Sequence, residues 1–199
     1  MKIVIVGGTG TIGSAVATAL QGRHEVVRVG RTRGDYQTDI ADSAAIGRTF
    51  DAIGGFDALV SAAGRVHYGD FAAVTEKEMA IGLQDKLMGQ VNLVLLGRDY
   101  IADEGSFTLT SGVVGHDPVR DGACASLVNG ALEYFVRAAA FELPRGLRIN
   151  CVSPGLLVES AEALGDSFPG HEPVPGARVA LAYVKSVLGH QTGQVYHVI

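Results

Sequence analysis

A glycine-rich turn near the N-terminus constrains the fold more than any other feature of this sequence. The short apolar run Ile3–Val6 leads directly into Gly7–Gly13, which reads GGTGTIG, and a helical pattern follows. A turn with this G-x-x-G-x-x-G spacing can bend tightly and bring its backbone close to an anion. The free N–H groups and the positive dipole end of the following helix would face that anion. The sequence therefore predicts a strand, a phosphate-binding turn and a helix at the start of the chain.

The rest of the sequence alternates short apolar runs with longer stretches of helical periodicity. Continuous apolar runs are typical of strands buried on both faces of a parallel sheet, and the alternation is typical of a doubly wound α/β fold. We therefore predict a single domain over residues 1–199, with a mostly parallel, seven-stranded sheet of the Rossmann type. The expected strands are Ile3–Val6, Glu25–Val29, Tyr36–Thr38, Ala58–Ser61, Phe107–Thr110, Arg148–Val152 and Val195–Ile199, and the expected helices lie near 12–21, 43–53, 76–101, 123–142 and 175–188.

Composition argues against several classes of protein. The net charge is −5 and no basic stripe is present, so a nucleic-acid partner is not expected. No apolar run approaches the roughly 18 residues that a membrane span needs. The two cysteines cannot build a disulfide framework, and no signal-peptide pattern follows Met1, so we expect a cytoplasmic protein. The proline-rich segment 155–175 is the most irregular part of the chain and is interpreted as a short lid.

The residues after the second expected strand bear on which dinucleotide the turn would bind. An acidic residue roughly 20 residues past the glycines would bind the ribose diol of NAD. Gly30-Arg31-Thr32-Arg33 stands there instead, and no acid occupies the end of that strand. A guanidinium group suits the adenosine 2′-phosphate of NADP, through a charge-assisted and often bidentate contact. The sequence therefore predicts NADP(H) in preference to NAD(H), although the nearby Asp35 would reverse the preference if it reached the ribose.

Further motifs follow the later strands: Asp39-Ile40, the Ser61–Gly64 segment SAAG, Ser111, and the Ser153–Gly155 turn. Together with the glycine turn they resemble the short-chain dehydrogenase/reductase family over essentially the whole chain. The resemblance implies that Asp39 meets the adenine, that Ser111 is the catalytic serine, and that the Pro-Gly turn packs by the nicotinamide. The cofactor-binding residues expected on these grounds are Gly7, Thr9, Gly10, Thr11, Ile12, Gly13, Arg31, Thr32, Arg33, Asp39, Ile40, Ala62, Ala63, Gly64, Pro154 and Gly155.

One pair of residues departs from the family pattern. The family's active site uses Tyr-x-x-x-Lys on the helix that follows the serine strand, where the lysine lowers the pKa of the tyrosine that exchanges a proton with the substrate oxygen. Here the tyrosine position is Ala125 and the lysine position is Asn129. Alanine has no proton to exchange and asparagine carries no charge. Tyr134 lies on the opposite face of the expected helix and is interpreted as a packing or interface residue.

Other residues are candidates to replace the missing pair. Lys86 occupies the position where the family places an asparagine that supports its lysine, so its ammonium group is expected to supply the missing charge; the alternative is a solvated helix lysine. His116 is the nearest proton donor to Ser111 in the sequence, and His67 and Tyr68 are further candidates. The catalytic residues expected are therefore Ser111, Lys86 and His116.

Two functions remain open on the sequence alone. The first is an NADPH-dependent oxidoreductase of atypical short-chain type that acts on a small carbonyl-type substrate. The second is a non-catalytic NADP(H)-binding redox sensor, because the expected cofactor residues are present while the family's proton donor is absent. Ser111 lacks the G-x-S-x-G context of an esterase, and the six histidines show no metal-ligand spacing, so no metal is expected. The helices near 76–101 and 123–142 match those that pair subunits in the family, which implies a homodimer or homotetramer.

Overall fold

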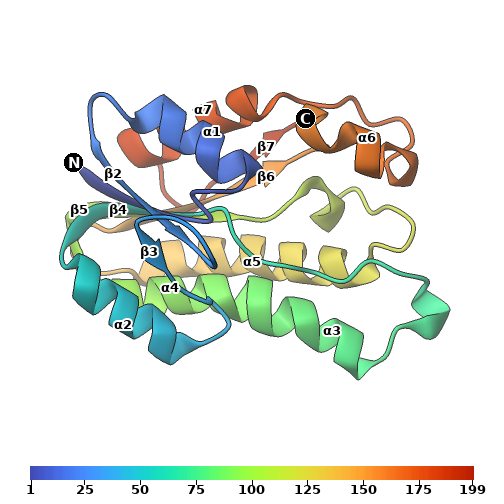
Figure 1. Ribbon diagram of the computed structural model, residues 1–199, viewed down its shortest axis with the longest axis horizontal. Coiled ribbons are helices and arrows are strands. Elements are labelled where there is room, and N and C mark those ends of the chain that lie inside the picture. The colour runs from blue at the N-terminus through green and yellow to red at the C-terminus, as the bar shows by residue number, and fades with distance from the viewer.

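A seven-stranded sheet forms the centre of the computed structural model, which describes all residues 1–199 (Figure 1). Every strand pair is parallel, and the order across the sheet is β3-β2-β1-β4-β5-β6-β7. The Rossmann-type sheet predicted from the sequence is therefore confirmed. The strands are β1 (Lys2–Val6), β2 (Glu25–Gly30), β3 (Tyr36–Gln37), β4 (Phe56–Ser61), β5 (Ile101–Thr110), β6 (Arg148–Pro154) and β7 (Val195–Val198).

Helices cover both faces of the sheet, which explains why the strands read as continuous apolar runs. On one face Ile3 and Ile5 of β1 pack in a core with α1 and α7, and on the other Val4 and Val6 pack in a core with α2, α4 and α5 (Figure 1). Successive side chains of a strand point to opposite faces, so both sets must be apolar. The helices are α1 (Thr11–Leu20), α2 (Ser43–Ile53), α3 (Glu76–Gly82), α4 (Gly89–Gly97), α5 (Ala123–Glu142), α6 (Ala161–Leu164) and α7 (Gly176–Leu188).

The helix expected over 76–101 is divided in the structure. Thr75 and Glu78 form the capping box that starts α3, as expected. A π-helix, Leu83–Met88, then separates α3 from α4, and α4 ends at Gly97. The prediction that the helix reaches residue 101 is wrong, because Ile101 already belongs to β5 and faces Phe56 of β4. The backbone N–H of Phe56 donates to the carbonyl of Tyr100, so the chain has joined the sheet by that point.

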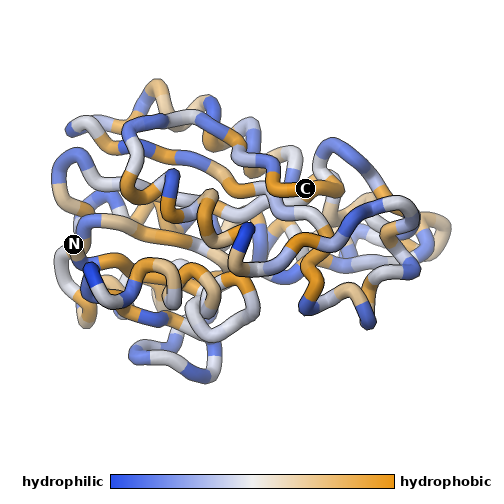
Figure 2. Tube along the Cα trace, turned by 90° about the horizontal axis from the view of Figure 1, so that it is seen from above, coloured by the Kyte–Doolittle hydropathy of each residue, from blue (hydrophilic) through white to orange (hydrophobic).

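The segment 155–175 crosses the sheet edge as a series of short turns that include α6. A single bridge joins Leu157 to Val174 at its base, and the carboxylate of Glu159 accepts a hydrogen bond from the backbone N–H of Gly176. Figure 2 shows hydrophobic stretches running along the central strands. No helix has both the length and the apolar character that a membrane span requires.

Candidate functional site

A cleft of about 350 Å³ opens at the carboxyl ends of β1, β2 and β4. The strand order reverses between β1 and β4, and ligands of open α/β sheets bind at such a switch point. Ten of the expected cofactor residues line this cleft together with five others. The lining residues are Val6, Gly7, Thr9, Gly10, Gly30, Arg31, Thr32, Thr38, Asp39, Ile40, Ala62, Ala63, Gly64, Arg65 and Asp85.

The glycine turn forms one wall of the cleft, and its glycines are required for different reasons. Gly7 has a φ of +82°, and a Cβ there would lie 2.4 Å from the carbonyl oxygen of Ala62. A Cβ on Gly13 would lie 2.1 Å from the carbonyl oxygen of Gly7, so Gly13 is needed for packing beneath the turn. Gly10 caps α1 without any side-chain hydrogen bond, which leaves the first N–H groups of the helix available. An anion at this helix end fits the arrangement.

The remaining expected cofactor residues lie outside this cleft. Thr11 begins α1 and Gly13 is buried in it. Ile12, Pro154 and Gly155 line a neighbouring pocket instead. Arg33 is exposed and does not line the cleft.

Arg31 and Asp35, which bear on the choice of dinucleotide, are placed differently in the structure. Arg31 and Thr32 line the cleft, whereas Asp35 does not. The Asp35 carboxylate accepts a hydrogen bond of 2.8 Å from the backbone N–H of Arg28, which holds it against β2. Asp39 uses one oxygen to accept from the backbone N–H of Ala41, at 3.0 Å.

An ion pair that the sequence did not suggest lies at the floor of the cleft. Asp85, in the π-helix, is buried and accepts hydrogen bonds from the backbone N–H and from Nε of Arg65, at 3.0 and 2.7 Å. The Arg65 side chain remains 60% exposed. Asp85 therefore orients a guanidinium group whose remaining donors face the cleft and solvent.

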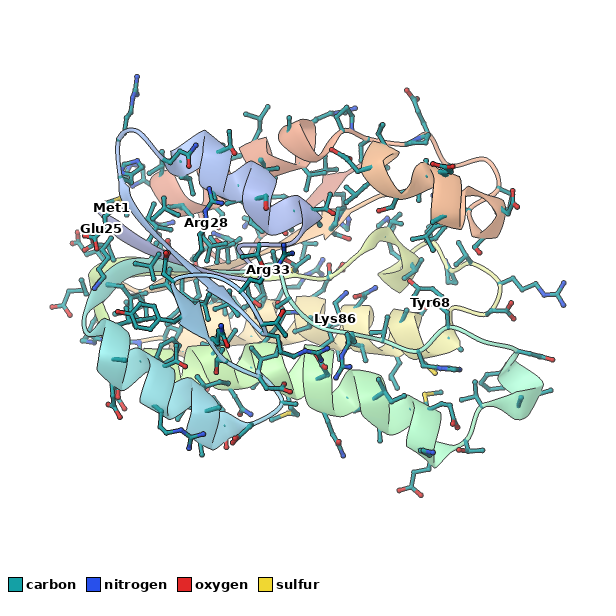
Figure 3. The ribbon with its side chains drawn as sticks, in the orientation of Figure 1. Met1, Glu25, Arg28, Arg33, Tyr68 and Lys86 are labelled. Carbon is teal, nitrogen blue, oxygen red and sulfur yellow. The ribbon has the colours of Figure 1, made fainter.

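A second pocket of about 200 Å³ lies next to the cleft and contains Ser111 and Lys86. The expected nicotinamide turn and part of the 155–175 segment form its other walls. In Figure 3, Lys86 and Tyr68 lie in the same part of the molecule, near α5. The lining residues are Ile12, Tyr68, Lys86, Ser111, Gly112, Val113, Val114, Asn129, Pro154, Gly155, Leu156, Leu157, Ser160, Leu164 and Phe168.

Lys86 is a fixed part of this pocket and not a solvated helix lysine. Its Nζ donates to the carbonyl oxygen of Ser111 at 2.9 Å and to Oδ1 of Asn129 at 2.7 Å. Burial of the ammonium group lowers the pKa of Lys86 to about 8. Gly64 makes the approach possible, because a Cβ on Gly64 would lie 2.7 Å from Lys86 side-chain carbons. Asn129, at the family's lysine position, therefore holds a lysine supplied by another helix.

Ser111 is buried, and its hydroxyl group is already engaged. Oγ of Ser111 donates a hydrogen bond of 2.8 Å to Oε1 of Glu133, a residue of α5 that is 7% exposed. A hydroxyl group has only one hydrogen to donate. Glu133 was missed in the sequence, although it lies one helical turn after Asn129 and so shares its face. The four-residue spacing from Asn129, together with the presence of a single acidic residue on an apolar helix face, could have indicated Glu133 from the sequence.

The other expected proton donors are separated by the structure. Tyr68 lines the pocket, and burial raises the pKa of its phenol. His116 lies outside the pocket, beyond the 3₁₀ turn Val113–Gly115, and its ring centroid is 4.3 Å from that of His197 on β7. Burial and the adjacent His116 lower the pKa of His197. The structure thus brings Ser111 and Lys86 together in one pocket. His116 lies outside that pocket, on the far side of Glu133, with a ring nitrogen within 4.8 Å of a carboxylate oxygen of Glu133.

Comparisons with known proteins bear on the family and the fold of this chain. The sequence pattern of the family described as enoyl-(acyl carrier protein) reductase matches residues 11–174. The protein lin1944 from Listeria innocua, solved as a crystal structure, is 46% identical, with 100% of each chain covered and a TM-score of 0.99. A small-chain dehydrogenase solved in complex with NADPH is 27% identical over 100% of this chain and 96% of its own, with a TM-score of 0.88. No protein with a curated description matches the chain.

A more distant structure supports the fold alone. Aldohexose dehydrogenase from Thermoplasma acidophilum, in its ligand-free form, is 20% identical over 99% of this chain and 92% of its own, with a TM-score of 0.87. The family match, the parallel sheet and the glycine turn lead to one conclusion. The chain belongs to the short-chain dehydrogenase/reductase family, and it has an oxidoreductase fold with a site for a nicotinamide dinucleotide.

Proposed function

We propose that the protein is an NADPH-dependent oxidoreductase of atypical short-chain type that acts on a small carbonyl-type substrate. The observation that carries the proposal is the Lys86 ammonium group, which is partly buried and held by two hydrogen bonds in the pocket that adjoins the dinucleotide cleft. When bound, the nicotinamide ring would supply or accept the hydride. The glycine turn would hold the pyrophosphate, and the Pro154-Gly155 turn would pack beside the ring.

Lys86 is proposed to take the role of the absent tyrosine and lysine. An ammonium group has three donors, and two of them are used by Ser111 and Asn129. The third is available to a substrate oxygen in the pocket. Nζ of Lys86 would stabilise the negative charge that develops on the substrate's carbonyl oxygen during reduction, and would transfer a proton to that oxygen. The lowered pKa of Lys86, about 8, suits a group that must both hold and release a proton near neutral pH.

Ser111 is proposed to position this lysine. Its carbonyl accepts from Lys86 while its hydroxyl group donates to Glu133, so one residue connects the partly buried ammonium group to the buried carboxylate. With its hydrogen donated to Glu133, Ser111 Oγ can only accept a hydrogen bond from a ligand in this geometry. The segment 155–175 is proposed to act as a short lid, because Leu156, Leu157 and Phe168 contribute apolar walls to the pocket.

A preference for NADP(H) over NAD(H) is proposed from the arginine side of the cleft. Arg31 lines the cleft, and the carboxylate of Asp35 is held by the backbone of Arg28, away from a ribose diol. The related small-chain dehydrogenase solved with NADPH supports the same choice.

A specific observation also favours the second candidate, a redox sensor without turnover. Ala125 offers no proton, and the hydroxyl hydrogen of Ser111 points to Glu133. A protein with these features would bind NADP(H) in the cleft and report its redox state through the lid.

Two measurements separate these candidates. Thermal shifts with NADPH and NADH test the cofactor site, because a ligand that binds only the native state raises the melting temperature. A panel of aldehydes, ketones and quinones, followed by NADPH absorbance, then tests for turnover. No shift with either cofactor would contradict both candidates, and tight NADPH binding without oxidation across a broad panel would favour the sensor.

A homodimer or homotetramer is proposed from the outer face of α4 and α5. Tyr134 and Phe141 of α5 are 72% and 92% exposed, and Leu95 of α4 and Leu127 of α5 are also exposed. Exposed apolar groups gathered on two helices are typical of a subunit interface. Sedimentation at micromolar concentration should therefore show a dimer or tetramer, and Phe141→Glu should shift it toward monomer while leaving the circular dichroism spectrum unchanged. A monomeric wild-type protein would contradict this assembly.

A further inference from the structure

Three potential metal ligands converge at the carboxyl edge of the sheet, outside both pockets described above. They are His116, which follows the 3₁₀ turn after β5, Glu133 of α5, and His197 of β7. Their ligand atoms all lie within 4.8 Å of one another. The three residues are far apart in the sequence and form no local motif. They come together only because the sheet and the helix packed on it fold as described.

The geometry leaves each ligand atom available. Glu133 is buried, and its Oε1 accepts from Ser111, but the carboxylate's other oxygen accepts no hydrogen bond from the protein. The two imidazole rings meet edge to face, with a 4.3 Å separation of centroids and an interplanar angle of 68°. Neither histidine forms a hydrogen bond or an ion pair with another side chain. The nearby His171 is different, because its Nε2 lies 3.6 Å from the carboxylate of Asp117.

The type of ligand indicates the type of cation. Two imidazole nitrogens and one carboxylate oxygen are a ligand set that suits Zn²⁺ and neighbouring transition metals, and poorly suits Mg²⁺ or Ca²⁺. Ligand atoms bound at about 2.0–2.2 Å around a tetrahedral cation lie roughly 3.3–3.6 Å apart. The observed spread of up to 4.8 Å is wider, so metal binding would require the two exposed histidine side chains to rotate and close it.

We propose that His116, Glu133 and His197 bind one divalent cation of the Zn²⁺ type, with at least one coordination position open to water or to a ligand. The cation would bind the free carboxylate oxygen of Glu133. It would thereby fix the position of the carboxylate group that accepts the hydrogen bond from the Ser111 hydroxyl group. It would also connect β7 and α5 to the loop after β5. Because Val198 pairs with Pro154, the ligand His197 lies next in sequence to a strand residue that supports the proposed nicotinamide turn.

The test is a titration of metal-free protein with ZnCl₂, followed by calorimetry, by bound-metal analysis after gel filtration and by melting temperature. We expect one Zn²⁺ per chain at micromolar concentration and a rise in melting temperature. His197→Ala and His116→Ala should each abolish stoichiometric binding. His190→Ala is the matched control, since His190 is an exposed histidine outside the cluster, and it should bind like the wild type.

Co²⁺ provides an independent readout that does not depend on activity. A four-coordinate Co²⁺ site absorbs strongly in the visible, and this band should appear in the wild type and His190→Ala and be absent from His197→Ala. The circular dichroism spectra of the metal-free variants should match that of the wild type, so that a loss of binding is not a loss of fold; if His197→Ala fails to fold, His197→Gln takes its place. The proposal is overturned if wild-type protein retains no Zn²⁺ at micromolar concentration, or if the ligand variants retain it.

Discussion

The dinucleotide cleft and the adjoining pocket are built in different ways, although both lie at the carboxyl edge of one sheet. The cleft is a backbone structure: glycines bring the main chain close together, and the helix end of α1 is left open. The pocket depends on side-chain contacts: Lys86, Ser111 and Asn129 line it from three separate elements and are joined through Lys86. Glu133 lies outside the lining and accepts the hydroxyl hydrogen of Ser111. The contrast suggests that substitutions in the cleft should change cofactor affinity, whereas substitutions in the pocket should change turnover.

Lys86→Met should produce the largest effect. It removes the buried charge that would stabilise the developing oxyanion, and loss of one such donor lowers kcat by about 100-fold or more. Steady-state kinetics with NADPH and an accepted substrate measure the loss, and NADPH affinity should change by less than about threefold. Lys77→Met, at an exposed lysine of the neighbouring helix α3, should leave both values unaltered. Unchanged turnover in Lys86→Met would end the proposed role of this lysine.

Arg31→Ala should have the next largest effect, and the effect should fall on binding. Loss of a charge-assisted contact with the 2′-phosphate costs about 1.5–3 kcal/mol, which corresponds to a Kd for NADPH roughly 10–150-fold higher. The Kd for NADH should stay the same, because NADH lacks that phosphate. Arg33→Ala is the matched control, since Arg33 is exposed but does not line the cleft. Equal losses for both cofactors would show that Arg31 does not discriminate between them.

Gly64→Ala should affect both the cleft and the pocket, because Gly64 lines the cleft and packs on Lys86. Its φ of +124° and the 2.7 Å approach of Lys86 leave no room for a Cβ. We expect unfolding free energy to fall by about 1–3 kcal/mol and turnover to fall with the displaced lysine. Denaturant unfolding and kinetics measure the two effects. Gly130→Ala, in α5, meets no atom within 4 Å and should be neutral or slightly stabilising; the comparison fails if both variants behave alike.

The pH dependence of stability should show an effect on folding alone, without any change in the sequence of the pocket's other residues. The pKa of Lys86 is lowered from 10.5 to about 8 by burial, so at pH values between these two the unfolded chain binds a proton that the native protein does not. Stability relative to Lys86→Met should therefore rise from pH 8 toward pH 10, and it should be constant below pH 7. Melting temperatures of the two proteins across this range give the difference. A flat difference would mean that the lysine is not buried as described.

The two regions also differ in how far the sequence predicted them. The strand, the glycine turn and the helix at the start of the chain follow from residue types and spacing, although Gly7 is also constrained by the distant carbonyl of Ala62. The roles of this turn and of Arg31 in cofactor binding stay predictions. The pairing of Lys86 with Asn129 and of Ser111 with Glu133 depends on how helices pack across the sheet. Family spacing located Ser111 and Lys86, but nothing local marked Glu133 as a partner of the serine.

Three other differences between the expected and the observed structure have a similar origin. The Arg65–Asp85 pair requires the π-helix to turn Asp85 toward the loop after β4, and regular helical periodicity does not describe that geometry. The helix α4 ends at Gly97, earlier than expected, because the chain joins the sheet by Tyr100. The carbonyl of Tyr100 accepts a hydrogen bond from the backbone N–H of Phe56, which is distant in the sequence. His116 follows Ser111 closely in sequence, yet its ring contacts His197, because the 3₁₀ turn Val113–Gly115 carries the chain away from the pocket.

The π-helix Leu83–Met88 has a consequence for how this site tolerates insertions and deletions. A π turn contains about one residue more than an α turn. Deleting one residue there would let α3 and α4 join as a regular helix, and the residues on one side of the join would rotate by about 100° relative to the other. The side chain of Lys86 would then no longer point toward Ser111, although all the residues of the pocket would still be present in the sequence. In this protein the position of the pocket's cationic side chain depends on the number of residues in a helix as well as on their identity.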